Sequence, residues 1–366
     1  MNKLFFQILR IAIGRQNALS VSPNEADWEE CYDVAKKQAL VGVCFIGVQK
    51  LPVEVRPSRP LYLKWMGMAA RIQQRNEKMN NASAKVYSEL KRFNFKSCLL
   101  KGQGVGTLYG DTLCTLRQSG DIDIWVRPLE NLSDRERRKR ITEWAMKVYP
   151  RSKTLYHQIS MELNGGIKLE IHYTPSWMNS PIKNRRLQRW FDQQADIVMQ
   201  HQTTLPNGES VATPTQAFNE VFILQHIYRH LFGEGIGLRQ VMDYYFVLLH
   251  NDGDNGELVK TLRHLGLYRF ACALMWVMGE LFCLPREKMI CEPNEKEGRF
   301  VLEEMMLAGN FGHYDKRIDH SKTSAWGLFQ RRTRRNFRFV YYYPEEVICT
   351  PIFKIWHFTC RKLHLI

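Results

Sequence analysis

The sequence predicts an α+β protein in which a small mixed β-sheet lies between an N-terminal and a C-terminal helical lobe. Helical periodicity dominates residues 1–95 and 213–366, whereas short segments with alternating apolar residues gather between residues 96 and 212. The length of 366 residues suits two or three such parts, and 45% hydrophobic residues supply enough apolar surface for their cores.

The N-terminal part is predicted to be helical. Residues 1–10 contain apolar side chains interrupted by Gln7 and Arg10, which favours a packed helix over a signal peptide. Apolar residues then recur every three to four positions along one long amphipathic helix. This apolar face consists of Trp65, Met68, Ile72, Met79, Ala82, Val86, Leu90 and Phe93.

Four strands are predicted in the central part, at residues 97–100, 121–126, 155–161 and 167–173. The Asn-Gly-Gly sequence at residues 164–166 is typical of a hairpin turn between the last two strands. A helical pattern resumes beyond them, so the helices before and after the sheet are expected to flank a cleft.

Two aspartates lie on the second predicted strand. Asp121 and Asp123 are one residue apart, so both side chains point to the same face. At an effective dielectric of about 20, two carboxylates roughly 5 Å apart repel each other by about 3 kcal/mol, so a partly buried pair requires a cation. Mg²⁺ suits carboxylates combined with nucleotide phosphates. Taken alone, such a strand can also be a solvated face.

Glu170 repeats this design on the last predicted strand. Ile167, Leu169 and Ile171 form one apolar face, so Glu170 and His172 share the other. Three carboxylates on adjacent strands form the cradle that two-metal nucleotidyl transfer requires. His172 either positions a phosphate or hydrogen-bonds the acid beside it.

A glycine turn between the first strand and the following helix predicts phosphate binding. Free N–H groups and the positive end of the helix dipole favour anions at a helix start. Gly102 lets a phosphate approach the backbone, Lys101 adds a positive charge, and Gln103 follows at the helix start. Arg117 either reaches the triphosphate or ties its loop to an acid. The alternative for the segment is a plain strand-to-helix turn.

These motifs resemble those of the DNA polymerase beta-type nucleotidyltransferase superfamily, and most closely those of an uncharacterised bacterial branch. The resemblance rests on Lys101-Gly102, residues 117–123 and residues 170–172, and it covers most of residues 25–300. It implies an N-terminal helical region at 1–95, a nucleotidyltransferase catalytic core at 96–212 and a C-terminal helical domain at 213–366.

The resemblance implies transfer of a nucleoside monophosphate from a nucleoside triphosphate, such as ATP, to an acceptor, with release of pyrophosphate. Asp121, Asp123 and Glu170 would bind Mg²⁺ or Mn²⁺, and Glu170 is the expected general base. The residues expected to bind the nucleotide are Lys101, Gly102, Gln103, Arg117 and His172.

Contacts with the acceptor or the base are expected from the C-terminal helices. His226 and His230 are spaced i, i+4 on one helix face, a spacing that also suits zinc, but no third ligand is visible nearby at a useful spacing. A role in the cleft together with Arg239 and Asp243 is one interpretation. Buried structural histidines are the other.

The net charge of +15, from 52 basic and 37 acidic residues, is typical of a protein with a polyanionic ligand. Basic residues gather in 133–154 and in 331–338, just before the aromatic run 339–343. This interleaving suits RNA. A solvated helix face followed by buried aromatic residues explains it better, so a small molecule or a protein is expected as acceptor in preference to RNA.

The nine cysteines are scattered without a Cys-x-x-Cys motif, which argues against a disulfide framework or a zinc knuckle and favours a cytoplasmic protein. No apolar window approaches the length of a membrane span, so no membrane partner is expected.

Two other function classes fit part of the pattern. An inactive or weakly active nucleotide-binding module acting through RNA or protein binding would retain the motifs. A glycosyltransferase that uses Asp-x-Asp for a nucleotide sugar would leave Lys101-Gly102 and Glu170 unexplained.

Overall fold

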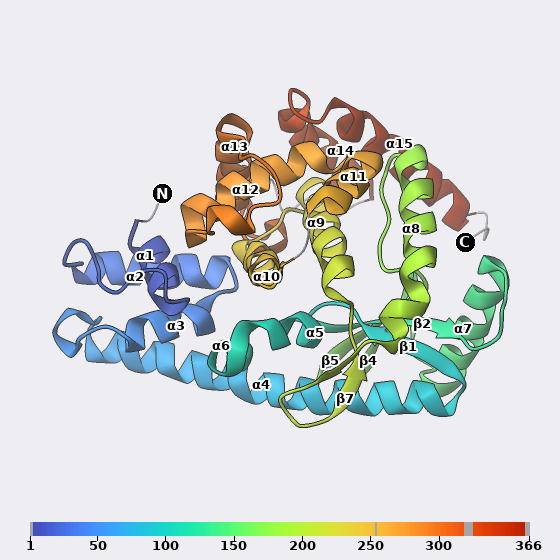
Figure 1. Cartoon of the computed structure of the whole chain (residues 1–366), viewed down its shortest axis with the longest axis horizontal. Helices are drawn as coiled ribbons and strands as arrows, with labels where there is room; N and C mark the ends of the chain where they lie inside the picture. Colours follow the sequence, from blue (N-terminus) through green and yellow to red (C-terminus); the bar gives the residue numbers. More distant parts are fainter. Residues whose placement is uncertain (1–2, 253–254, 318–324, 363–366) are drawn as a thin grey trace.

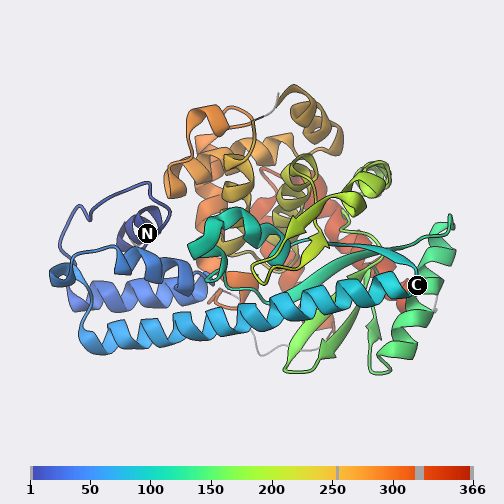
Figure 2. The same ribbon diagram turned by 60° about the horizontal axis from the view of Figure 1, so that its bottom comes forward.

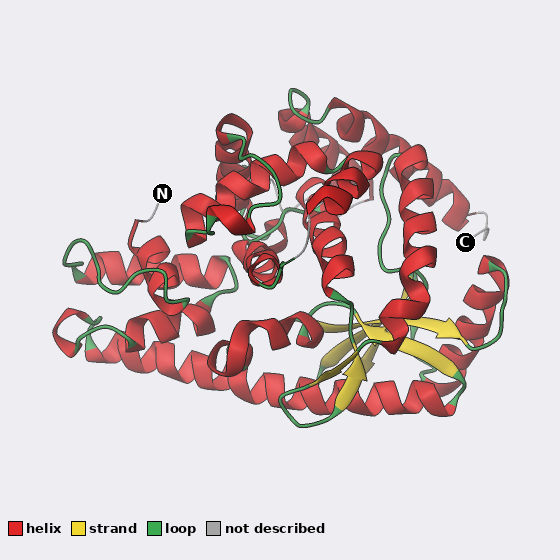
Figure 3. Cartoon of the chain, viewed as in Figure 1, coloured by secondary structure: helices red, strands yellow, loops and turns green. Residues whose placement is uncertain are grey.

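A five-stranded sheet lies at one side of the molecule and helices make up the rest (Figure 1). The computed structural model describes residues 3–252, 255–317 and 325–362. Figure 3 shows the strands gathered in one place, with helices on either side of them. The predicted α+β class with a small mixed sheet and flanking helices is therefore confirmed.

The sheet has the strand order β1-β2-β5-β4-β3. β1 (Phe95–Leu99) pairs antiparallel with β2 (Asp121–Pro128), which pairs in parallel with β5 (Ile167–His172). β4 (Gln158–Leu163) forms an antiparallel hairpin with β5, and the short β3 (Lys153–Thr154) lies at the edge. All four predicted strands are found, as β1, β2, β4 and β5. In the sheet, β1 is the neighbour of β2, and β4 is the neighbour of β5.

One predicted strand boundary is wrong. The third predicted strand was expected from residue 155, but β4 begins at Gln158. The Leu155 N–H donates to the Gln158 carbonyl at 2.8 Å, so the chain turns here between β3 and β4. A second hairpin, β6 (Gln202–Thr204) and β7 (Ser210–Ala212), was not predicted, although Gly208 in its loop has a φ of +83°.

The two faces of the sheet have different neighbours. Ile122, Ile124 and Leu169 are buried in one core with side chains of α4 (Arg59–Arg92) and α7 (Asp134–Val148). The face with the opposite parity carries the polar residues of β2 and β5. There Trp125 stacks with Phe218 at 6.1 Å between ring centroids, which brings α9 (Gln216–Gly233) over this face.

α4 connects the N-terminal helices to the sheet. It has 34 residues, which corresponds to about 50 Å, and Figure 2 shows it running from the N-terminal helices across the front of the sheet. Trp65 is buried near its start and donates to the Val41 carbonyl at 2.9 Å, while Leu90 is buried near its end. The predicted long helix is confirmed. The helices beside its start are α1 (Lys3–Ala12), α2 (Glu25–Lys37) and α3 (Val41–Gln49).

Helices after the sheet cover the polar face and the side of the molecule. These helices are α8 (Pro181–Gln200), α9, α10 (Leu238–Leu249), α11 (Asn255–Leu265), α12 (Tyr268–Phe282), α13 (Glu295–Ala308), α14 (Ala325–Asn336) and α15 (Pro344–Lys362). Two short helices, α5 (Gln103–Gly106) and α6 (Gly110–Cys114), lie between β1 and β2 in the chain. Within the described residues, none of the helices is both long and apolar enough to cross a membrane. The division of the chain into three domains stays a prediction.

The aromatic run 339–343 is buried only in part. Phe339 and Tyr343 are buried as expected, but Val340 and Tyr341 are exposed. The run leads from α14 into α15 and alternates between contact with α9 and contact with solvent: Phe339 packs against Phe232 at 4.9 Å between ring centroids. The prediction of a wholly buried aromatic face is therefore too simple.

Two glycines test the packing of the N-terminal helices. A Cβ at Gly47 on α3 would overlap with the carbonyl oxygen of Ile8 on α1, whereas a Cβ at the exposed Gly67 on α4 would meet open space. We expect Gly47→Ala to lower the free energy of unfolding by about 1–3 kcal/mol, and Gly67→Ala to raise it by about 0.5–1 kcal/mol. Denaturant unfolding measures both, and a shift of the same sign in both variants would contradict the close contact of α1 with α3.

Candidate active site

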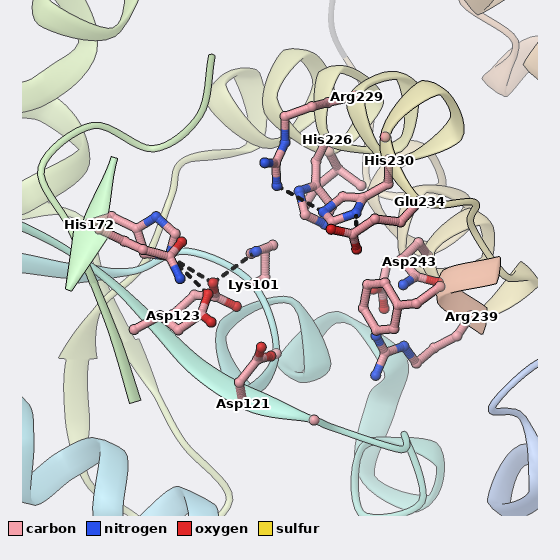
Figure 4. A pocket seen from close by; sticks show the side chains of 18 of the residues that line it. Lys101, Asp121, Asp123, His172, His226, Arg229, His230, Glu234, Arg239 and Asp243 are labelled. Carbon is pink, nitrogen blue, oxygen red and sulfur yellow. Dashed lines mark hydrogen bonds and ion pairs between the residues drawn. The ribbon is translucent and has the colours of Figure 1, made fainter. Parts of the chain in front are cut away.

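The polar residues of the sheet open into a cavity of about 560 Å³ between the sheet and helices α9 and α10. We call this the central cavity. Its floor is formed by β2, β4, β5 and the Lys101-Gly102 turn. Its roof includes His226, Arg229 and His230 on α9 and Arg239 on α10. Figure 4 shows these roof residues pointing toward the acids and Lys101.

The floor brings together two carboxylates and an imidazole. The parallel register pairs Asp123 with Glu170 across β2 and β5. Ligand atoms of Asp123, Glu170 and His172 all lie within 4.8 Å of one another, and all three side chains are buried. His172 Nε2 is 2.8 Å from Asp123 Oδ1 and 3.9 Å from Glu170 Oε2. His172 thus contacts both acids, and more closely the one on the neighbouring strand.

Asp121 lies beside this group and is half-buried. Burial and the charge of Asp123 raise the pKa of its carboxyl group, although Lys101 opposes the shift. The raised pKa reflects the repulsion expected between acids of the same strand face. Asp121 and Asp123 both line the central cavity, and their shared role as metal ligands stays a prediction.

Asp123 is held in its charged form by two partners. Lys101 Nζ lies 2.8 Å from Asp123 Oδ1, the same oxygen that contacts His172. Burial opposes ionisation of Asp123, but Lys101 and His172 outweigh it and lower the pKa of the carboxyl group. The lysine predicted to bind phosphate therefore forms an ion pair with a predicted metal ligand.

The donor set of the floor fits a divalent cation. Carboxylate oxygens suit Mg²⁺ and Mn²⁺, and the imidazole of His172 adds a nitrogen donor beside them. Asp123, Glu170 and His172 already converge, and Lys101 supplies the positive charge that this cluster of acids needs. An entering cation would take over part of that charge compensation.

The Lys101-Gly102 turn requires glycine for its own conformation. Gly102 has φ +55° and ψ −113°, which a residue with a side chain rarely adopts, and a Cβ there would lie 3.4 Å from the Asp121 carbonyl oxygen. The helix that follows, α5, has only four residues, so its dipole is weak. Gln103 is buried and does not line the central cavity, so this geometry does not support its predicted nucleotide contact.

Arg117 ties its loop to an acid and also lines the central cavity. Its Nε and Nη2 donate to the two carboxylate oxygens of Asp243 at 2.7 Å each, and both side chains are buried. Tyr109 donates to Asp243 Oδ1 at 2.6 Å, and Arg117 also donates to Ser119 Oγ at 2.8 Å. Asp243 therefore anchors the loop that leads into β2, and a contact of Arg117 with the triphosphate stays a prediction.

Of the histidines of the roof, His226 is buried and His230 is half-buried. The rings of His226 and His230 are 4.3 Å apart, and burial lowers the pKa of each well below its ordinary value, helped by the charge of Lys101. Within the described part of the chain, neither belongs to a cluster with metal-ligand geometry. Both line the central cavity, as the cleft interpretation expected.

Arg239 and Arg229 are two of the guanidinium groups that line the central cavity, together with Arg117 and Arg335. Arg239 lines the central cavity as predicted and donates to the Gln118 carbonyl at 2.5 Å. Arg229 was not predicted: its Nη2 is 2.8 Å from His230 Nε2, and its guanidinium lies 4.0 Å from the centroid of the Trp177 ring. The i, i+3 spacing from His226 is the signal that places it on the same helix face.

Lys168 also belongs to the floor and was not among the predicted site residues. Its Nζ is 2.5 Å from Glu170 Oε1. Strand alternation puts Lys168 on the face of Glu170 and His172, so the sequence contained this signal.

A family model described as uncharacterised nucleotidyltransferase matches residues 24–283, which is most of the chain. The chain belongs to this nucleotidyltransferase family. The matched residues include the floor of the site and the roof residues of α9 and α10. The family assignment supports a general role in nucleotidyl transfer, and the floor and roof of the central cavity form the candidate site.

A solved structure, that of an antigenic nucleotidyltransferase-like protein from Paracoccidioides brasiliensis, is similar at 15% identity and a TM-score of 0.37. The alignment covers 60% of this chain and 94% of that chain. No curated protein matches the sequence.

The anchor of the β2 loop leads to a stability prediction. Asp243→Asn leaves Arg117 buried without its counter-charge, so we expect the free energy of unfolding to fall by about 3–5 kcal/mol. The control is Asp192→Asn, which removes the half-exposed partner of Arg127 and should cost at most about 1 kcal/mol. Urea unfolding measures both, and equal losses would show that the buried pair is not the anchor.

The roof histidines lead to a pH prediction. His226 and His230 stay neutral in the folded protein because burial lowers the pKa of both, whereas the unfolded chain takes up protons below about pH 6.5. Below that pH the unfolded state binds more protons, so stability should fall by up to about 1.4 kcal/mol per pH unit for each histidine. Unfolding of wild type and His226→Asn between pH 7 and 5 tests this: the variant should lose less stability, and an equal loss would contradict the prediction.

Proposed function

We propose that this protein transfers a nucleoside monophosphate from a nucleoside triphosphate to an acceptor and releases pyrophosphate. The observation that supports the proposal is the convergence of Asp123, Glu170 and His172 on the floor of a cavity whose roof carries two guanidinium groups. A metal-bound triphosphate carries positive charge on the metal ion and negative charge on the phosphates. The acids of the floor suit the metal ion, and the guanidinium groups of the roof suit the phosphates.

Asp121, Asp123 and Glu170 would hold the divalent cation, with His172 beside them. When bound, Mg²⁺ or Mn²⁺ would supply charge stabilisation for the phosphates of the donor. The protein's own cations do the rest of the binding. Lys101 is placed to exchange its partner Asp123 for a phosphate oxygen, and Arg239, which binds the Gln118 carbonyl three residues before Asp121, extends the positive charge along the triphosphate.

Glu170 is the proposed general base. Lys168 binds its Oε1, and Oε2 makes no hydrogen bond within the part of the chain that the structure describes. Oε2 can therefore accept the proton of an acceptor hydroxyl as its oxygen attacks the α-phosphorus. His172 contacts Asp123 and lies 3.9 Å from this oxygen, so it would position both acids.

The resemblance to the polymerase beta-type superfamily and its bacterial branch supports the same proposal. ATP is the donor we would test first, and the cytoplasm is the compartment we propose. The described cysteines are all free of disulfide bonds, which agrees with a reducing compartment. A small molecule or a protein is proposed as acceptor in preference to RNA.

A weakly active nucleotide-binding module is the second candidate. It is favoured by the ion pair of Lys101 with Asp123, because this lysine supplies a positive charge where the cation would bind. Such a module would bind a triphosphate without fast turnover. Metal-dependent release of pyrophosphate distinguishes the two candidates, and a nucleotide-sugar donor would indicate a glycosyltransferase instead.

The test of the proposed function uses two variants of β2 and a distant control. Asp121→Asn and Asp123→Asn should each lower metal-dependent pyrophosphate release roughly a thousandfold, which corresponds to about 4 kcal/mol of lost transition-state stabilisation. Asp196→Asn alters an exposed carboxylate that pairs with Lys96 and should retain activity. Chelation of the metal should abolish the activity of wild type.

Stability must be measured alongside activity. Asp121→Asn relieves a repulsion and should leave the fold intact, whereas Asp123→Asn also leaves Lys101 with less counter-charge. Pyrophosphate release by Asp121→Asn equal to that of wild type would refute the proposed role of β2.

A further inference from the structure

Two guanidinium groups lie at opposite ends of the row of acids in the central cavity. Burial and Arg117 lower the pKa of Arg239, and Asp243 and Asp121 oppose that shift. Burial lowers the pKa of Arg229 to about 10, and Glu234, Asp123 and Glu170 oppose it. Contacts place the two groups. Arg239 donates to the carbonyl of Gln118, three residues before Asp121, and so lies near the Asp121 end of the row. Arg229 lies over Trp177, whose ring centroid is 3.9 Å from that of His157, and the His157 centroid is 5.4 Å from that of His172, so Arg229 lies near the β5 end, which carries Glu170 and His172. Figure 4 shows the two arginines well separated, with Arg229 above Asp123 and Arg239 to the side, at the level of Asp121.

Arg229 is held in place but has no anionic partner. Its guanidinium lies over the Trp177 ring at 4.0 Å and contacts His230 at 2.8 Å. Among the described residues, no carboxylate lies within ion-pair distance of it. Its neighbour His230 does lie near an acid, because His230 Nδ1 is 3.9 Å from Glu234 Oε2.

Two buried donors at this end of the cavity have no hydrogen-bond partner among the described residues: Arg229 Nε and Trp177 Nε1. Both residues line the central cavity. An unpaired buried donor costs about 1–3 kcal/mol, and more when it belongs to a charged group. A ligand that presents several acceptor oxygens would remove this cost, and an anionic ligand would also compensate the charge of Arg229.

The geometry of nucleotidyl transfer separates the ligands of the two arginines. The attacking and leaving oxygens lie roughly in line on opposite sides of the α-phosphorus. With Glu170 as the base, the acceptor enters at the Glu170 end, where Arg229 lies. The pyrophosphate group then leaves toward the Asp121 end, where Arg239 lies.

We propose that Arg229, with Trp177 and His230, binds a phosphate group carried by the acceptor, so that the acceptor is a small phosphorylated molecule with a free hydroxyl group. This inference rests on the proposed function. A cavity of about 560 Å³ falls in the range of small-molecule sites, roughly 300–1,000 Å³, which favours a small acceptor.

The acceptor hydroxyl oxygen forms a bond to the α-phosphorus, and the bond from the α-phosphorus to the bridging oxygen breaks. The electron pair of that bond leaves with pyrophosphate, and Glu170 takes the hydroxyl proton. The phosphate at Arg229 stays unchanged and only fixes the acceptor's orientation.

Titration calorimetry with inorganic phosphate tests the inference, with and without a saturating non-hydrolysable triphosphate and Mg²⁺. Wild type should bind phosphate in both conditions. Arg229→Gln should weaken this binding about tenfold or more, the loss expected for one charge-assisted hydrogen bond. The matched control, Arg239→Gln, should weaken binding of the triphosphate and leave the phosphate binding that is measured with saturating triphosphate unchanged.

Three results would overturn the inference: no phosphate binding to wild type at millimolar concentration, equal phosphate affinity in Arg229→Gln, or loss of phosphate binding when the triphosphate is present. The last would assign Arg229 to the donor. If no variant binds the triphosphate, the proposed function fails, while the phosphate titration alone still decides whether Arg229 forms an anion site.

Arg229 packs on Trp177, so the variant's fold must be checked by thermal unfolding. Should Arg229→Gln unfold at the assay temperature, Arg229→Lys replaces it. The lysine retains the charge but loses the planar fork. Phosphate binding to Arg229→Lys should lie between absent and wild-type strength, and affinity equal to that of wild type would count against the proposed contact.

Discussion

The parallel register of β2 and β5 places the carboxylates of Asp123 and Glu170 opposite each other inside the protein. Like charges so placed destabilise a fold unless cations accompany them. Lys101 and Lys168 each bind one of the two acids, and His172 lies between them. Much of the site can be understood as compensation for this one pairing of strands.

A second buried ion pair keeps the strands aligned with the helices above them. Asp243 on α10 accepts hydrogen bonds from Arg117 and Tyr109, which both precede β2 in the chain. Asn76 on α4 adds hydrogen bonds to the carbonyls of Thr115 and Arg117. The loop before β2 is therefore held by α4 on one side and by α10 on the other. These hydrogen bonds fix where β2 begins, and so they position Asp121 without contacting its side chain.

The sequence predicts those parts of the site that depend on local periodicity. Strand alternation alone puts Asp121 and Asp123 on one face, and Glu170 and His172 on another strand's matching face. Helical periodicity likewise predicts α4. What brings the strands together is the backbone register, and no local pattern encodes that β2 pairs with β5 in parallel.

Tertiary packing explains most of what the sequence does not predict. Arg117 finds its partner 126 positions away, and Arg229 enters the site because α9 crosses over the sheet. Gln103 follows the predicted turn, yet the short helix α5 buries its side chain. Such contacts depend on how distant elements dock, which a single sequence does not show.

The long helix α4 has a mechanical consequence. A continuous helix of 34 residues is stiff, and its two ends are buried in different groups of helices and strands. α4 therefore joins the N-terminal helices to the floor of the cavity as one stiff element, and it resists displacement of these two parts relative to each other. Because Asp243 also ties α10 to the loop before β2, a displacement that widens the cavity for a nucleotide is expected at α9.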